Sequence, residues 1–374
     1  SEMKAQGIDV INMSVGEPDF MTPDHIKEAG KKAIDDNYSK YSPVPGYMDL
    51  REAISEKLAK ENNLSYSAKE IIVGTGGKQG VCNAILALVN PGDEVIIPAP
   101  YWVSYPQMVK LAGGTPVTLR TPLESDFKLT PVQLEAAIKP KTKMLIICSP
   151  SNPTGSVYTQ DELNALAEVV KKHDDMYVLS DEIYEHINYV GFKASIAAAP
   201  DMKDRTIICN GVSKAYAMTG WRLGWVAAPE WIIKGMNKLQ GQYTSGTNDV
   251  AQRAALAAYK GDQQCVEDMR VAFQRRRDLI VKLAKEIPGL EVNVPQGAFY
   301  LFPHCKKLFG KSYGDYTINT STDFAMYLLQ EAHVATVAGD AFGEPDGFRM
   351  SYATSDDNIR EALRRIKEAC EKLK

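Results

Sequence analysis

The chain has 374 residues, of which 44% are hydrophobic and 24% are charged, and its formal net charge is −4. These values are typical of a soluble globular enzyme with one large domain and one smaller domain. They exclude the basic surface that nucleic acid requires, and no apolar run approaches the roughly 20 residues of a membrane span. The six cysteines are scattered, which favours a reducing cytoplasm over a disulfide framework. The five histidines lie far apart, so no metal site is predicted.

Short apolar runs alternate with helical stretches between about Tyr66 and Val226, as expected for an α/β fold. The runs are unbroken, which favours strands that are covered on both faces. The capping-box sequence at 159–162 predicts that a helix starts there and continues to about His173. The sequence therefore predicts a large domain with a mostly parallel central sheet flanked by helices. The predicted strands are Ile71–Val73, Glu94–Ile97, Lys143–Ile147, Met176–Leu179, Thr206–Ile208 and Leu223–Ala227.

The pattern changes after about Asp262, where a long charged helix is predicted over 265–286. Apolar stretches at 290–294 and 297–302 follow, and a final helix is predicted over 357–374. This order indicates a smaller α+β domain that the N-terminal segment completes. The predicted large domain covers residues 18–275, and the predicted small domain covers residues 1–17 and 276–374.

The residues that follow each predicted strand are candidates for a site, because ligands of open α/β sheets bind at the carboxyl ends of the strands. After the first strand, Gly76, Gly77 and Lys78 precede a helical stretch, where backbone N–H groups can bind a phosphate. The glycine spacing misses the dinucleotide fingerprint by one residue, and Gln79 stands where a P-loop has Ser or Thr, so a plain tight turn remains the alternative.

Two further strand ends carry polar side chains. Asn152 follows the third strand within a Pro-rich turn, and its amide is suited to a phenolate oxygen, although a plain turn also explains it. Asp181 and Tyr184 follow the fourth strand. A buried carboxylate is costly unless it is paired, and a pyridinium nitrogen would be a suitable partner for Asp181.

Lys214 follows the fifth strand and precedes Arg222 by eight positions. Burial would lower the pKa of this lysine and give a nucleophilic amine that can form a Schiff base with pyridoxal phosphate. Arg222 can then bind the phosphate as a fork. Lys214 alone is also compatible with a surface loop, but together the four strand ends provide what a pyridoxal phosphate site needs.

These same segments resemble the motifs of a known family. Residues 149–155, 180–184 and 213–222 are similar to motifs of the class I/II (fold-type I) pyridoxal-phosphate-dependent aminotransferases. The similarity continues at 15–20, 41–46, 100–105 and 349–353, so it covers nearly the whole chain in order. Within the family, the chain most resembles the bacterial aspartate aminotransferases of the Iβ subgroup.

The resemblance implies a catalytic role for three residues. Lys214 would hold the cofactor and move the α-proton, Asp181 would keep the ring nitrogen protonated, and Tyr184, with Asn152, would bind the phenolic oxygen. Trp102 would stack on the ring face, where a core aromatic is the alternative.

The resemblance also implies the contacts of the phosphate and of the substrate. The phosphate would be held by Gly76, Gly77, Ser213 and Arg222, with Tyr41 from the partner subunit of a homodimer. Lys78 would lie beside the cofactor at a position where relatives use a lysine for the distal carboxylate, and a charge near the phosphate is its alternative role. The substrate would be bound by Arg349 at the α-carboxylate, with Gly16, Lys78, Trp102 and Asn152 nearby. The chain departs from some relatives at Gly211, where they place a phosphate-binding serine.

The implied activity is amino transfer from aspartate to 2-oxoglutarate by a ping-pong mechanism, with amino acids and 2-oxo acids as the only partners besides a second subunit. A prephenate or aromatic aminotransferase, or a β-lyase, remains an alternative on the same scaffold. A non-catalytic regulator would need an appended DNA-binding domain, for which the sequence provides no basic helix-turn-helix segment.

Overall fold

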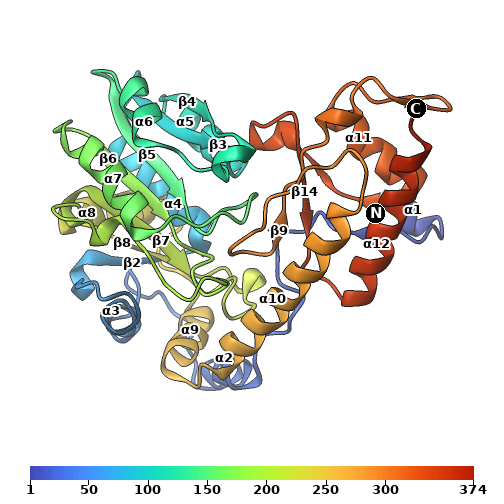
Figure 1. The fold of residues 1–374 in the computed structure, drawn as a ribbon. Coiled ribbons are helices and arrows are strands. Elements are labelled where there is room, and N and C mark those ends of the chain that lie inside the picture. Colours follow the sequence, from blue (N-terminus) through green and yellow to red (C-terminus); the bar gives the residue numbers. More distant parts are fainter.

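A seven-stranded sheet forms the centre of the larger part of the molecule (Figure 1), here described for residues 1–374 in a computed structural model. Six strands run in the same direction, and only β8 is antiparallel to its neighbours. The mostly parallel sheet predicted from the sequence is confirmed. The strands, in spatial order, are β2 (Ile71–Gly74), β8 (Gly224–Ala227), β7 (Thr206–Gly211), β6 (Tyr177–Asp181), β5 (Thr142–Cys148), β3 (Glu94–Ala99) and β4 (Thr115–Arg120).

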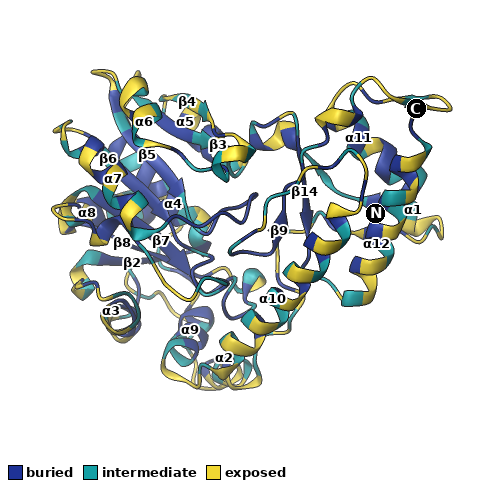
Figure 2. Ribbon diagram, viewed as in Figure 1, coloured by how far each residue is buried: buried dark blue, intermediate teal, exposed yellow.

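Helices cover both faces of this sheet, so its strands are largely buried except for the edge strand β4 (Figure 2). Neighbouring residues of one strand, such as Ile71 and Ile72, pack into different apolar clusters on opposite faces. This two-sided burial explains why the runs are continuous in the sequence. No helix has the length and apolar character that crossing a membrane would require. Helices α4 (Gly76–Leu88), α5 (Ser104–Leu111) and α8 (Glu230–Tyr243) cover one face, and α2 (Asp24–Asp35), α3 (Met48–Asn62), α6 (Pro131–Ala137), α7 (Gln160–Lys171) and α9 (Asp249–Lys260) cover the other.

All six predicted strands are present, and helix α7 begins at the predicted capping box. There the Thr159 side chain accepts from the Glu162 N–H, and the Glu162 carboxylate accepts from the Thr159 N–H. Strand β4 was not predicted. It lies at the edge of the sheet and alternates between exposed and half-buried residues, so its sequence lacks a continuous apolar run.

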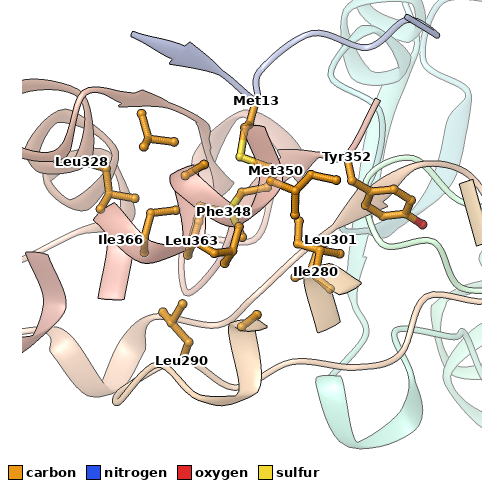
Figure 3. Close-up of a cluster of buried hydrophobic side chains, with 14 of the residues drawn as sticks. Met13, Ile280, Leu290, Leu301, Leu328, Phe348, Met350, Tyr352, Leu363 and Ile366 are labelled. Atoms are coloured by element: carbon orange, nitrogen blue, oxygen red, sulfur yellow. The ribbon is translucent and has the colours of Figure 1, made fainter. Parts of the chain in front are cut away.

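The smaller part combines the N-terminal and C-terminal segments, as predicted, because β1 pairs in parallel with β12. Its apolar core lies between helices α10 and α12 and a short antiparallel sheet (Figure 3). Helix α10 crosses the predicted boundary at 275, and that boundary stays a prediction. Residues 290–294 form no strand and make only an isolated bridge through Glu291. The elements are α1 (Glu2–Ala5), β1 (Ile11–Asn12), α10 (Gln264–Lys285), β9 (Tyr300–Leu301), β10 (Ser312–Tyr313), β11 (Tyr316–Thr317), α11 (Ser321–Tyr327), β12 (Val334–Ala335), β13 (Val337–Ala338), β14 (Phe348–Ser351) and α12 (Asp356–Lys372).

Candidate active site

A pocket of about 480 Å³ lies at the carboxyl ends of the central strands and is closed on one side by residues of the smaller part. Strands β5, β6 and β7 are neighbours in the sheet, so the polar residues that follow them converge. Eleven residues predicted for the site line this pocket, namely Gly16, Gly77, Lys78, Trp102, Asn152, Asp181, Tyr184, Ser213, Lys214, Arg222 and Arg349.

Lys214 extends into the pocket from the loop after β7, and its ammonium donates to the backbone oxygen of Gly16 at 2.5 Å. Desolvation by the surrounding protein lowers the pKa of Lys214 to about 8, and the positive charges of Arg349 and Arg222 act in the same direction. The carboxylates of Glu17 and Asp181 oppose this shift. Roughly a tenth of the amine is therefore unprotonated at pH 7, far more than for an ordinary lysine, and this neutral form is what a nucleophile or general base requires.

Asp181 ends β6 with its carboxylate buried at the base of the pocket. Its Oδ2 accepts from the Tyr105 hydroxyl at 2.5 Å, and its Oδ1 accepts from the Ile183 N–H at 3.3 Å. No cationic side chain lies within ion-pair distance, and burial raises the pKa of Asp181. A cationic group in the pocket would remove this electrostatic cost.

The N-terminus of α4 forms one wall together with Arg222. Gly76 has a φ of 81°, and a Cβ there would lie only 2.5 Å from an Arg222 nitrogen, so glycine is required for this close approach. Ser213 is buried beside them. Backbone N–H groups at a helix start, a hydroxyl and a guanidinium together form a suitable site for a phosphate.

Three glycines in register hold this wall against the sheet, because Gly74 and Gly211 both pair with Gly224. A Cβ on Gly224 would lie 2.3 Å from the backbone nitrogen of Gly77. A Cβ on Gly211 would lie 2.8 Å from the Gly224 Cα, which explains why no serine stands at this position. The absence of side chains here therefore sets the position of the α4 N-terminus.

Arg349 lies on β14 at the opposite side of the pocket. Its guanidinium donates to Asn152 Oδ1 at 3.0 Å and to the Ser14 backbone oxygen at 2.8 Å. Its Nε is buried and has no partner, so the side chain retains donors for an anion. Asn152 also lines the pocket, and because its side-chain oxygen accepts from Arg349, its amide N–H groups remain available as donors.

The sequence model of the family "Aminotransferase class I and II" matches residues 8–366. The chain belongs to this family. It is 51% identical over 372 residues to an aspartate/prephenate aminotransferase of Cereibacter sphaeroides, covering 99% of this chain and 93% of the relative. Among solved structures, the aspartate aminotransferase of Rhizobium meliloti superimposes with a TM-score of 0.97 at 46% identity, covering 100% of this chain and 94% of that one. The aspartate aminotransferase of Thermus thermophilus with maleate superimposes with a TM-score of 0.92 at 41% identity, covering 98% of this chain and 94% of that one.

Trp102 and Lys78 lie together on one side of the aminotransferase pocket. The Lys78 ammonium is 5.1 Å from the centroid of the Trp102 ring and has no carboxylate partner within 4 Å. Lys78 is exposed at the start of α4, so its charge is available at the pocket entrance.

Two buried tyrosines of the aminotransferase pocket were not predicted. Tyr105 donates to Asp181, and the hydroxyl of Tyr300 lies 2.7 Å from that of Tyr184. The Arg349 guanidinium also lies 4.5 Å from the Tyr300 ring centroid. In the sequence both tyrosines stand within apolar stretches, where they resemble core residues, so only their three-dimensional partners reveal them.

An apolar wall near Arg349 was also missed. It consists of Val15 together with Val337, Ala341 and Phe342 of the smaller part. Arg120 at the end of β4 donates to the buried Glu344 at 2.8 and 2.6 Å, which fixes the loop after Phe342 against the large sheet.

Tyr41 is the predicted site residue that lies apart from the pocket. Its side chain is 97% exposed and lines a separate groove with residues 246–249. A single subunit therefore does not bring Tyr41 to the other predicted site residues.

Proposed function

We propose that this aminotransferase transfers the amino group of aspartate to 2-oxoglutarate by a ping-pong mechanism, with pyridoxal phosphate as its cofactor. The observation that carries the proposal is the convergence of Lys214, Asp181 and Arg349 in one pocket. Pyridoxal phosphate, when bound, would supply an aldehyde that condenses with amines and a ring that accepts electrons.

The residues of the pocket fit this cofactor. The buried Asp181 carboxylate, which lacks a cationic partner, suits a protonated ring nitrogen. The donors of Asn152 and Tyr184 suit the phenolic oxygen, and Trp102 offers an aromatic face. The wall formed by Gly76, Gly77, Ser213 and Arg222 suits the phosphate.

Lys214 would hold the cofactor and then act as general acid and base at the substrate Cα. Its lowered pKa, about 8, supports both roles, since the amine can accept a proton and return it near neutral pH. The neighbouring cations Arg349 and Arg222 contribute to this lowering of the Lys214 pKa.

Arg349 would bind the α-carboxylate of every substrate, because its unpartnered Nε and remaining N–H groups form a fork. Lys78 would bind the second carboxylate of aspartate or 2-oxoglutarate from the pocket entrance. An ammonium on a flexible stem can do this without the strict geometry of arginine. The names of the Rhizobium meliloti and Thermus thermophilus relatives support aspartate as the substrate.

A second candidate is amino transfer to prephenate or to aromatic oxo acids. The apolar wall of Val15, Val337 and Phe342 supports it, because this wall could accept a ring. The Cereibacter sphaeroides relative carries both aspartate and prephenate in its name. Prephenate also has two carboxylates, so Arg349 and Lys78 are compatible with either acceptor.

We further propose that the enzyme is a cytoplasmic homodimer whose sites lie at the subunit interface. All six cysteines are free, which supports a reducing location. The fully exposed Tyr41 would reach the phosphate of the partner subunit, and residues 242–247 would contact the partner as well. Twofold dimers are the commonest oligomers.

A half-reaction tests the proposed function. Purified protein loaded with pyridoxal phosphate is mixed with one amino acid at a time, and the loss of the absorption band of the bound cofactor is followed. Aspartate and glutamate should convert the protein, and 2-oxoglutarate should restore it. Conversion by neither dicarboxylic amino acid would refute the proposed substrates.

A further inference from the structure

Tyr105 lies in the first turn of α5, three residues after Trp102, and the two rings pack edge to face at 5.3 Å. Its side chain is 2% exposed and extends beneath the pocket to Asp181, where its hydroxyl donates to Oδ2 at 2.5 Å. One short segment therefore carries both an aromatic wall of the pocket and a donor to the buried carboxylate.

Few other groups interact with Asp181. The neighbouring strands present the thiols of Cys148 and Cys209, whose pKa values are raised by burial, so both stay neutral. Lys214 is the charged group that faces Asp181, and it makes no ion pair with it. The only side chain that donates a hydrogen bond to the carboxylate is Tyr105.

The electrostatics of the pair favour a permanent donor. Burial and the charge of Asp181 raise the pKa of Tyr105 well above its usual value, so the phenol keeps its proton. Burial raises the pKa of Asp181, whereas the hydrogen bond from Tyr105 opposes that rise. A donor on Oδ2 makes the carboxylate less basic. The remaining acceptor positions of the carboxylate can still accept a proton or hydrogen bond from another group.

We propose that Tyr105 is a positioning residue. Its hydroxyl holds the Asp181 carboxylate in place and makes it less basic, so that the proton between Asp181 and the ring nitrogen of pyridoxal phosphate stays on the nitrogen. This inference rests on the proposed function, because it requires the cofactor in this pocket. Tyr105 acts through Asp181 and does not need to contact the ring itself.

The test uses pyridoxal phosphate labelled with ¹⁵N in its ring, bound to the full-length protein and observed by NMR between pH 6 and 9. The ¹⁵N shift reports directly whether the ring nitrogen carries a proton. The variants are Tyr105→Phe and Asp181→Asn. Tyr327→Phe is the matched control, because Tyr327 is equally buried and donates at 2.7 Å to the Ala369 backbone oxygen, in the core of the smaller part.

The wild-type protein and Tyr327→Phe should show a protonated ring nitrogen. Tyr105→Phe should move the signal toward the unprotonated position and weaken cofactor binding by about ten- to a hundredfold, the usual worth of a hydrogen bond to a charged group. Tyr105→His retains a hydrogen-bond donor on a ring and should restore the wild-type signal. Comparison with Tyr105→Phe then shows whether the change comes from the lost donor or from a disturbed fold.

Two results would overturn the proposal in different ways. If Asp181→Asn moves the signal while Tyr105→Phe matches Tyr327→Phe, Tyr105 is an ordinary core residue and the proposed function is unaffected. If Asp181→Asn leaves the wild-type signal unchanged, Asp181 does not face the ring nitrogen. The assignment of Asp181 in the proposed function then fails together with that of Tyr105.

Discussion

Glu182 provides a prediction about stability that follows from its burial. Its side chain is buried directly after the inner strand β6, where the hydroxyls of Ser180 and Ser195 both donate to Oε2 at 2.7 Å. Desolvation, together with the neighbouring charge of Glu185, raises the pKa of Glu182 to about 7 from 4.5, although Lys57 and the two hydroxyls oppose the shift. The folded protein therefore holds one proton on Glu182 that the unfolded chain has released at pH 5 to 7.

The sign and size of the effect follow from this difference. A raised pKa contributes stability that is full below pH 4.5 and is lost as the pH rises through about 7. Between pH 5 and 8 the loss is about 2.5 kcal/mol, since each unit of difference is worth about 1.4 kcal/mol. Glu182→Gln keeps a neutral side chain of the same shape at every pH. The free energy of unfolding of this variant should therefore increase by about 2.5 kcal/mol relative to that of the wild type when the pH is raised from 5 to 8.

The measurement is urea unfolding of the cofactor-free proteins at both pH values, with the difference between variant and wild type compared across pH. Glu162→Gln is the control. Although partial burial acts in the opposite direction, hydrogen bonds from Thr159 and Lys128 lower the pKa of Glu162, so it stays ionised throughout this range. The change in unfolding free energy caused by Glu162→Gln should therefore be the same at pH 5 and pH 8. A Glu182→Gln difference that is equally independent of pH would refute the reasoning.

Four further predictions concern the site. Lys214→Ala should lose at least about a thousandfold in kcat, and borohydride treatment of the loaded wild-type protein should label only the peptide that contains Lys214. Lys78→Ala should reduce kcat/KM by about ten- to a hundredfold for aspartate and 2-oxoglutarate but not for alanine, whereas an equal loss for all substrates would assign Lys78 to the phosphate. Tyr300→Leu should raise KM about three- to thirtyfold for every amino acid because Arg349 loses its aromatic support, while Tyr300→Phe should leave KM unchanged and lower kcat about fivefold. Gly224→Ala should weaken pyridoxal phosphate binding by about ten- to a hundredfold, because the new methyl group would displace the N-terminus of α4; unchanged affinity would show that the helix start can move without cost.

The sequence predicts most of the sheet because burial on both faces leaves a strong pattern. Strands β5, β6 and β7 are continuous apolar runs, and polar residues begin where each of them ends. Edge strand β4 has no such run, and the short strands of the smaller part contain only two to four residues. Their pairing depends on contacts between distant segments, such as Ile11 with Val334, which no local pattern records.

The candidate site residues could be predicted where a polar group follows a strand, and not where a polar group belongs to an apolar element. Asn152, Asp181 and Lys214 stand out because buried strands precede them. Tyr105 and Tyr300 belong to apolar stretches, and their hydroxyls acquire a role only through Asp181 and Tyr184, which are distant in sequence. Their identification requires knowledge of which elements face each other.

The single antiparallel strand, β8, explains how Lys214 and Arg222 come to the same edge of the sheet. Strand β7 ends at Gly211, and β8 returns from Gly224 directly beside it, so the loop between them remains at the carboxyl edge. A parallel connection would need a crossover to the opposite edge and would carry Arg222 away from Lys214. The reversal therefore places the amine and the guanidinium together, and Gly224 lets the α4 N-terminus lie against the start of the returning strand. Chain direction and the absence of one side chain thus assemble this wall of the pocket from three segments that are separated in sequence.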